Sequence, residues 1–201
     1  NSRFEADEDN VIPVLDENWF EDDIVERFQK FLRVTFGEDH YKENLEFIEN
    51  AIGKNLRKYF IKDFYDYHVR RFKKRPIYWM FSSPKGTFNA LIYMHCYRPD
   101  TASVVLNDYL RDFRSKLEAK KVDCEQTQIS TSASEAEKVR ATKEIDKIKL
   151  MLDELNHWEK DVLHPLATQR IEIDLDDGVK VNYPKFGAAL KPIKGLEAND
   201  E

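Results

Sequence analysis

The stretch Lys74–Tyr97, KRPIYWMFSSPKGTFNALIYMHCY, decides how this chain folds. Two apolar, aromatic-rich runs at 77–81 and 87–94 flank the polar break SSPKG at 82–86. A short break that contains Pro and Gly is typical of a longer hairpin loop, so we predict a β-hairpin. Both alternating faces of the first run are apolar, and we therefore expect helices to cover this hairpin on two sides.

Upstream of the hairpin, apolar residues recur at helical spacing. We expect one helix from Asn18 to about Phe36, because Asn18 and Glu21 match a capping box. A second helix is predicted over 41–52, and helical spacing continues through 54–74. These helices should pack on the hairpin.

Downstream, two segments carry apolar seams with charged residues elsewhere. The first seam begins at Leu106, a polar connector spans 124–134, and the second seam runs to Val162. This pattern predicts an antiparallel helical hairpin whose second arm is longer, about 45 Å, and ends at His164-Pro165. Such an arm exceeds what a compact core needs, so we interpret it as a spacer.

The last part of the chain alternates apolar and polar residues across 170–183. Asp177-Gly178 lies between the two alternating runs and predicts a second β-hairpin. The tail from Pro184 to Glu201 should be extended against the surface.

The predicted fold class is therefore α+β and mainly α. We divide the chain into an acidic tether, a helical domain with a central β-hairpin, a helical hairpin that acts as a spacer, and a C-terminal hairpin with its tail. The corresponding ranges are 1–17, 18–100, 101–168 and 169–201.

Composition limits the function classes. The chain has 201 residues, a net charge of −6 and two cysteines, which argues against a general nucleic-acid coat and against a disulfide scaffold. We expect reduced thiols and a cytoplasmic location. No apolar run is long enough to span a bilayer, so no membrane contact is expected.

Positive charge gathers in one segment of this acidic chain. Its members are Lys54, Arg57, Lys58, Lys62, Arg70, Arg71, Lys73, Lys74 and Arg75. One interpretation is contact with DNA phosphates, which Lys and Arg neutralise with release of counterions. The other is a solvated helix face that pairs with the acidic residues of 16–26. The sequence alone leaves both open.

Sequence motifs for catalysis are absent. The chain contains no phosphate-binding loop, no G-x-G-x-x-G, no G-x-S-x-G, no H-E-x-x-H and no paired Cys ligands. His157 and His164 lie near one face but lack the further ligands that a metal site needs. We therefore assign no catalytic residue, no metal and no cofactor to this chain.

Two strings carry a family resemblance: Lys74–Tyr97, and DLDDGVKVNY at 174–183 with Lys185-Phe186 after it. They resemble the C-terminal part of the PglX family, the large adenine-specific DNA methyltransferases of BREX bacteriophage-defence systems, and the likeness extends from about Trp19 to Gly187. The resemblance implies a parent protein that takes a methyl group from S-adenosylmethionine and acts on a flipped adenine through an N-P-P-Y-type motif. This chain has neither that motif nor a glycine-rich cofactor loop.

Two hypotheses follow. In the first, the chain is a non-catalytic part of such an enzyme that contacts double-stranded DNA through Arg70, Arg71, Lys73, Lys74, Arg75 and Lys85. In the second, it is a scaffold that docks on the methyltransferase core of the same chain, or on other BREX components, without touching DNA. S-adenosylmethionine would bind outside this chain in either case.

Overall fold

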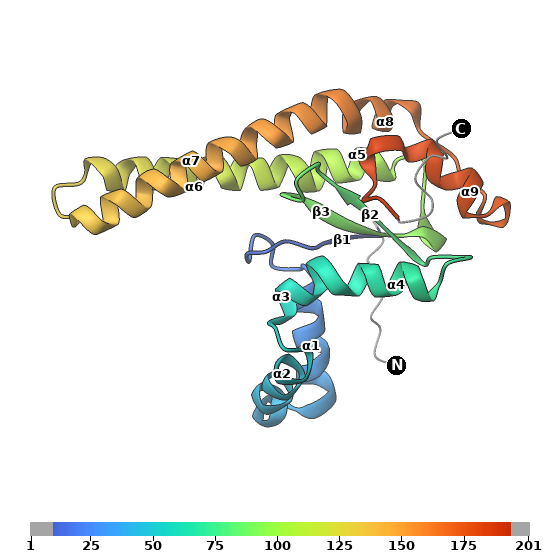
Figure 1. Ribbon diagram of the computed structural model, residues 1–201, viewed down its shortest axis with the longest axis horizontal. Helices are drawn as coiled ribbons and strands as arrows, with labels where there is room; N and C mark the ends of the chain where they lie inside the picture. Colours follow the sequence, from blue (N-terminus) through green and yellow to red (C-terminus); the bar gives the residue numbers. More distant parts are fainter. Residues whose placement is uncertain (1–9, 194–201) are drawn as a thin grey trace.

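The computed structural model describes residues 10–193 and confirms an α+β fold that is mainly helical. Its centre is a three-stranded antiparallel sheet of β1 (Val11–Pro13), β2 (Tyr78–Ser82) and β3 (Asn89–Tyr93), in the order β1-β3-β2 (Figure 1). β2 and β3 are the predicted hairpin. Helices lie on both sides of this sheet, as the apolar faces of β2 require.

The two faces of β2 meet different elements. Trp79 and Phe81 lie against Phe186, at ring-centroid distances of 5.5 and 5.9 Å. On the opposite face, the ring of Tyr78 lies 5.6 Å from that of His68 in α4. Trp79 and Phe81 on the first face and Met80 on the second are all at most 2% exposed, so the strand is covered on both faces.

The first strand corrects the predicted tether at 1–17. Residues 1–9 lie outside the described residues, but Val11–Pro13 form β1 and pair with β3, with Ile12 opposite Leu91. Residues 10–15 are all buried. The strand was not predicted because its apolar run is short and acidic residues flank it. Its pairing partner, β3, lies about 80 residues away in the sequence.

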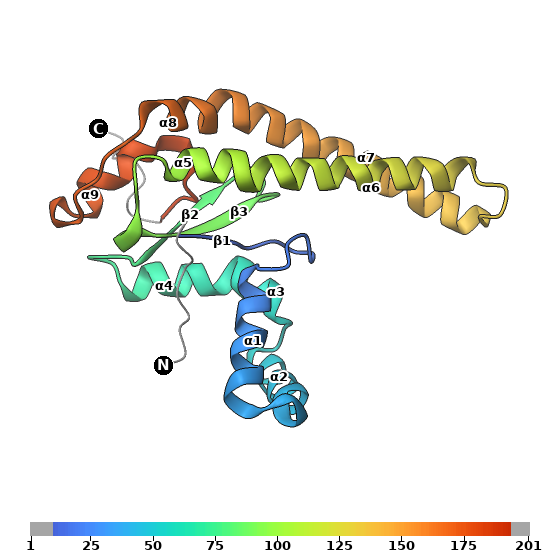
Figure 2. The same cartoon turned by 180° about the vertical axis from the view of Figure 1, so that it is seen from behind.

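Helices α1 (Ile24–Phe36) and α2 (Glu38–Ile52) follow, joined at Gly37. The cap of α1 is Asp23 and not Asn18, because the Asp23 carboxylate accepts the backbone N–H of Glu26 at 2.9 Å. Gly37 has a φ of 82°, a conformation that favours glycine. The two helices project away from the sheet in both views (Figures 1 and 2).

A continuous helical run then leads to β2. It consists of α3 (Leu56–Tyr59), a π-helical turn (Phe60–Phe64) and α4 (Tyr65–Arg71). Every fourth residue of this run is aromatic or His, and consecutive rings of Phe60, Phe64, His68 and Phe72 lie 5.0 to 6.2 Å apart. Phe60 and His68 are buried, Phe64 is partly buried, and Phe72 at the end of the stripe is 43% exposed.

The predicted antiparallel helical hairpin is confirmed (Figure 2). Its first arm comprises α5 (Thr101–Val104), a π-helical turn (Val105–Leu110) and α6 (Arg111–Ile129); its second comprises α7 (Glu135–Trp158), a π-helical turn (Glu159–Leu163) and α8 (His164–Gln169).

Two boundaries of this helical hairpin differ from the prediction. α6 continues to Ile129, so the connector is shorter than 124–134. The second arm passes through Pro165, which lies two residues beyond the end of the π-helical turn Glu159–Leu163. The arm ends at Arg170, whose φ is 48°.

The predicted C-terminal β-hairpin over 170–183 is wrong. Residues Leu175–Asp177 form a 3-10 turn, Val179–Asn182 form α9, and Tyr183–Ala189 continue as 3-10 turns. The Asp174 carboxylate accepts the backbone N–H of Asp176 at 2.9 Å, which closes a local turn in place of a strand. Of the alternating apolar residues, Val179 and Tyr183 are buried from helical turns, whereas Val181 is 51% exposed.

The extended tail is observed for a few residues. Leu190 pairs with Phe81, and the Lys191 backbone N–H donates to the Met80 carbonyl at 2.8 Å, so the chain runs beside β2. Ile193 is buried, and the tail beyond it lies outside the described residues. No helix within residues 10–193 is both long enough and apolar enough to cross a bilayer.

Candidate nucleic-acid interface

Five of the six cations proposed from sequence lie together where α4 passes into β2. We call residues 70–75 the basic turn; they include Arg70, Arg71, Lys73, Lys74 and Arg75. All five side chains are exposed, and the connection projects at the edge of the molecule (Figure 1). Five cations in six consecutive residues make this turn a concentrated positive charge on an acidic chain.

Few ion pairs within the chain neutralise the cations of the basic turn. Arg75 forms an ion pair with Asp176 at 3.1 Å, in which both side chains are more than two-thirds exposed. The Arg70 side chain donates from Nε to the backbone carbonyl of Asp66 at 3.0 Å. Within residues 10–193, no ion pair involves Arg70, Arg71, Lys73 or Lys74.

Buried polar groups hold the turn at its base. The His68 Nε2 atom accepts the backbone N–H groups of Ile77 and Tyr78, at 3.0 and 3.1 Å. The Tyr65 hydroxyl accepts the Met80 N–H at 3.3 Å. Burial lowers the pKa of His68 below 6.5 and raises the pKa of Tyr65, so both groups stay neutral. α4 and β2 are thereby fixed to each other, and the cations extend from a rigid base.

A small hollow adjoins the basic turn. It has a volume of about 40 Å³, and its lining includes Lys74, Arg75, His95, Trp79 and Asn182. The Trp79 indole N–H is buried and has no acceptor among the described residues. The lining of the hollow thus includes two cations, an imidazole and an indole ring.

Lys85 is separated from the basic turn. It lies in the β2–β3 connection, at the opposite end of β2, and its side chain is exposed. Its backbone N–H donates to the Glu154 carboxylate at 2.8 Å, and the other oxygen of that carboxylate accepts the Thr87 hydroxyl. Hence the structure groups five of the six proposed residues and places the sixth elsewhere.

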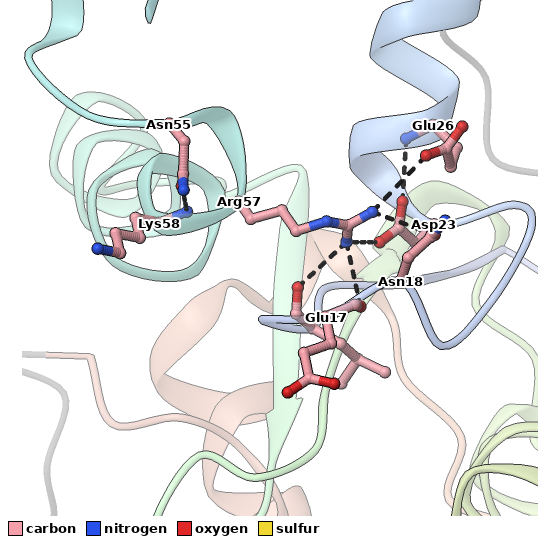
Figure 3. A network of polar contacts seen from close by, with 8 residues as sticks. Glu17, Asn18, Asp23, Glu26, Asn55, Arg57 and Lys58 are labelled. Carbon is pink, nitrogen blue, oxygen red and sulfur yellow. Dashed lines mark hydrogen bonds and ion pairs between the residues drawn. The ribbon is translucent and has the colours of Figure 1, made fainter. Parts of the chain in front are cut away.

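The first half of the positive segment differs from the basic turn because Lys54 and Arg57 form ion pairs within the chain, and Figure 3 shows the contacts of Arg57. Arg57 pairs with Asp23, whose side chain is 1% exposed, and lies 3.7 Å from the Glu26 carboxylate. It also donates to the backbone carbonyl of Glu17 at 3.2 Å and to the Asn18 side chain at 3.2 Å. The interpretation as a paired helix face therefore holds for Arg57, and a similar pair joins Lys54 to Asp63.

The sequence alone did not identify the buried residues that lie beneath the basic turn. His68 continues the four-residue spacing of Phe60 and Phe64, and that spacing could have identified it as a buried residue. Nothing local in the sequence indicated that its Nε2 atom would accept the backbone N–H groups of both Ile77 and Tyr78. Nor did it predict that Trp79 would line a hollow formed with residues from the C-terminal turns.

The described residues show no metal centre. No group of three His, Cys, Asp or Glu side chains within residues 10–193 is arranged to hold an ion. The chain also lacks the glycine-rich loop and N-P-P-Y motif that methyl transfer would need, so no step of that reaction is assigned to its residues.

Comparisons with known proteins identify relatives over nearly the whole chain. It is 38% identical over 210 residues to the adenine-specific methyltransferase BrxX of Escherichia coli O9:H4 (strain HS), covering 98% of this chain. It is 35% identical over 205 residues to the adenine-specific methyltransferase PglX of Lacticaseibacillus casei (strain Zhang), covering 96%. No family model matches. The predicted resemblance is therefore confirmed: the chain is homologous to part of the BrxX and PglX adenine-specific methyltransferases and spans 17% of their length.

Proposed function

We propose that this chain is a non-catalytic, DNA-facing segment of a PglX-like, S-adenosylmethionine-dependent adenine-specific DNA methyltransferase that acts in bacteriophage defence. The homology to BrxX and PglX supports the parentage. The missing motifs support a role outside the methyl-transfer step. The cofactor and the flipped adenine would bind in the part of the enzyme that this chain does not include, and the whole protein would work in the bacterial cytoplasm.

The basic turn is the observation that carries this proposal. Arg70, Arg71, Lys73 and Lys74 are exposed and carry no ion pair within residues 10–193. A duplex presents one negative charge per about 1.7 Å of its axis, so a compact group of cations can meet several phosphates at once. The turn would position the duplex by its backbone, and base reading would need other side chains.

Charge reversal in the intact methyltransferase tests the proposal. Replacement of Arg70, Arg71, Lys73 and Lys74 by Glu should weaken DNA binding, measured by fluorescence anisotropy across a salt series. Each phosphate contact contributes about 0.9 to the slope of log K against log salt, so the slope should become shallower by up to about 4. The loss of DNA affinity should be similar for unrelated duplex sequences, because phosphate contacts do not depend on base sequence.

A matched variant controls for the change in net charge. Replacement of Arg140, Lys143, Lys149 and Lys160 by Glu alters the charge equally, and these exposed residues lie on the helical hairpin. This variant should bind DNA with nearly the parental slope. Equal losses in both variants, or parental binding after reversal in the basic turn, would contradict the proposed interface.

A further inference from the structure

The hollow beside the basic turn is formed by three parts of the chain that lie far apart in the sequence. Residues 74–76 lead into β2, His95 follows β3, and residues between 175 and 182 supply the third side. The Met94 N–H donates to the Ile77 carbonyl at 2.9 Å, which places the turn that carries His95 beside the start of β2. α9 and the connection from α4 to β2 lie at the same end of the molecule in both views (Figures 1 and 2).

The charged side chains in the lining of the hollow are all cationic. Lys74 and Arg75 belong to the lining, His95 adds an imidazole, and the lining contains no Asp or Glu. Within residues 10–193, neither Lys74 nor His95 forms an ion pair. A site of this composition favours an anion, because a cation would meet repulsion there and no opposite charge.

The carboxylates of the neighbouring turn, 174–177, lie outside the lining. The Asp174 carboxylate accepts the backbone N–H of Asp176 at 2.9 Å, and Asp176 pairs with Arg75 at 3.1 Å. Both partners of that ion pair are more than two-thirds exposed, so water competes with it and the pair is weak. An incoming anion with more charge than one carboxylate can therefore replace Asp176 beside Arg75.

The walls of the hollow are buried and held by hydrogen bonds. Trp79 and Asn182 are at most 2% exposed, and the Asn182 side chain donates to the Gly178 carbonyl at 3.0 Å. The buried Trp79 indole N–H has no acceptor among the described residues, which is uncommon for a buried donor. The volume of about 40 Å³ has room for about three water molecules, a space that matches one phosphate group.

We propose that this hollow binds one phosphate group, held by Lys74, Arg75 and His95. Lys and Arg bind phosphate through charge-assisted hydrogen bonds, and an imidazole donates an N–H in both its neutral and its protonated form. The inference rests on the proposed function, in which the phosphate belongs to the backbone of the bound duplex. One strand would then be fixed at a single phosphate while the other cations of the basic turn contact its neighbours.

Two neighbouring substitutions in the intact methyltransferase test the hollow. His95→Glu places a carboxylate in the lining, whereas Cys96→Glu adds the same charge at the next residue, which is exposed and outside the lining. His95→Glu should weaken the binding of a duplex, measured by fluorescence anisotropy, at least about threefold more than Cys96→Glu does. Equal affinities of the two variants for DNA would overturn the proposal.

Cryo-electron microscopy of the intact methyltransferase identifies the source of the phosphate. With a duplex bound, a backbone phosphate should occupy the hollow, and a bound duplex beside an empty hollow would overturn the proposal. Inorganic phosphate in the hollow without DNA, and no backbone phosphate there with DNA, would assign the site to a free anion and overturn its place in the DNA interface.

The hollow and the basic turn can fail separately in these experiments. If charge reversal in the basic turn weakens DNA binding but His95→Glu and Cys96→Glu bind DNA alike, the phosphate site alone is refuted. If that charge reversal leaves DNA binding unchanged, the proposed DNA interface is refuted, whatever the hollow binds.

Discussion

At the scale of single residues, Arg57 and Arg75 show how one positive segment contains two kinds of cation. The Arg57 side chain is 18% exposed and pairs with the buried carboxylate of Asp23, whereas the side chains of Arg75 and Asp176 are 71% and 85% exposed. The sequence shows both as charges in one run. It could not distinguish them, because the partner of Arg57 lies 34 residues earlier in the chain.

The two arginines should therefore differ in their effect on stability. Arg57→Ala leaves the Asp23 carboxylate buried without its partner and should lower the free energy of unfolding by about 3 kcal/mol. Arg75→Ala removes an exposed pair and should change it by less than about 0.5 kcal/mol. Urea denaturation of the two variants measures the difference, and equal effects would refute the distinction.

His68 should make stability depend on pH in a defined direction. Its pKa is lowered by burial, so the unfolded chain binds a proton more readily than the folded chain does. The contribution of neutral His68 is complete above pH 6.5 and is lost as the pH falls below that value, because protonation removes the acceptor for Ile77 and Tyr78. Stability should therefore decrease on acidification.

Denaturation between pH 8 and pH 5 measures this effect, since the ordinary pKa of His lies near 6.5. His68→Gln should flatten the dependence, and His164→Gln, at an exposed position, should leave it as in the parent. A parental slope in His68→Gln would show that other groups cause the loss.

At the scale of elements, the hairpin at β2 and β3 was predictable and the C-terminal turns were not. The β2–β3 hairpin has apolar residues on both faces of β2, a pattern that few other elements produce. The burial of the residues in β2 and β3 agrees with this pattern. The segment 170–183 also alternates, but Asp174 and Gly178 close local turns and Val179 packs inward from α9. The alternating apolar pattern covers only a few residues, and the local turns at Asp174 and Gly178 prevented it from forming a strand.

The helical hairpin is attached to the sheet through Glu154. This 9% exposed carboxylate of α7 accepts the Lys85 N–H and the Thr87 hydroxyl. Glu154→Ala leaves these donors without their acceptor and should cost about 2 kcal/mol in the free energy of unfolding, measured by thermal and urea denaturation. Asp153→Ala, at an exposed neighbour, should be nearly neutral, and a similar loss there would contradict the assigned role.

At the scale of the whole molecule, the sheet separates surfaces that the sequence presents as neighbours. Nine residues lie between Arg75 and Lys85, yet the two occupy opposite ends of β2. The helical hairpin was predictable from its seams, but the projection of α1 and α2 was not, because it depends on how separate helices pack. Apart from β1, which removes residues 11–13 from the predicted tether, the division of the chain into 1–17, 18–100, 101–168 and 169–201 stays a prediction.

This separation predicts a weak effect for Lys85. The five residues of β2 span about 16 Å, roughly twice the screening length at physiological salt. Lys85→Glu should therefore change the affinity of the intact methyltransferase for DNA by less than about twofold. Lys74→Glu, measured in the same way, should reduce this affinity more than Lys85→Glu does. Equal losses in a titration at 0.15 M salt, the condition for that screening length, would mean that the duplex covers both ends of the strand.

The three π-helical turns within residues 10–193 have a consequence for how this protein tolerates change in length. Each wide turn holds one residue more than a regular α-helical turn does, so the later residues keep nearly the orientation that an uninterrupted α-helix would give them. Deleting one residue from 159–163 would restore regular winding and leave the residues beyond it nearly in place, whereas a deletion in a regular turn of α7 would rotate everything beyond it by about 100°. Single-codon losses should accordingly be tolerated more readily at these three places than in the regular turns beside them.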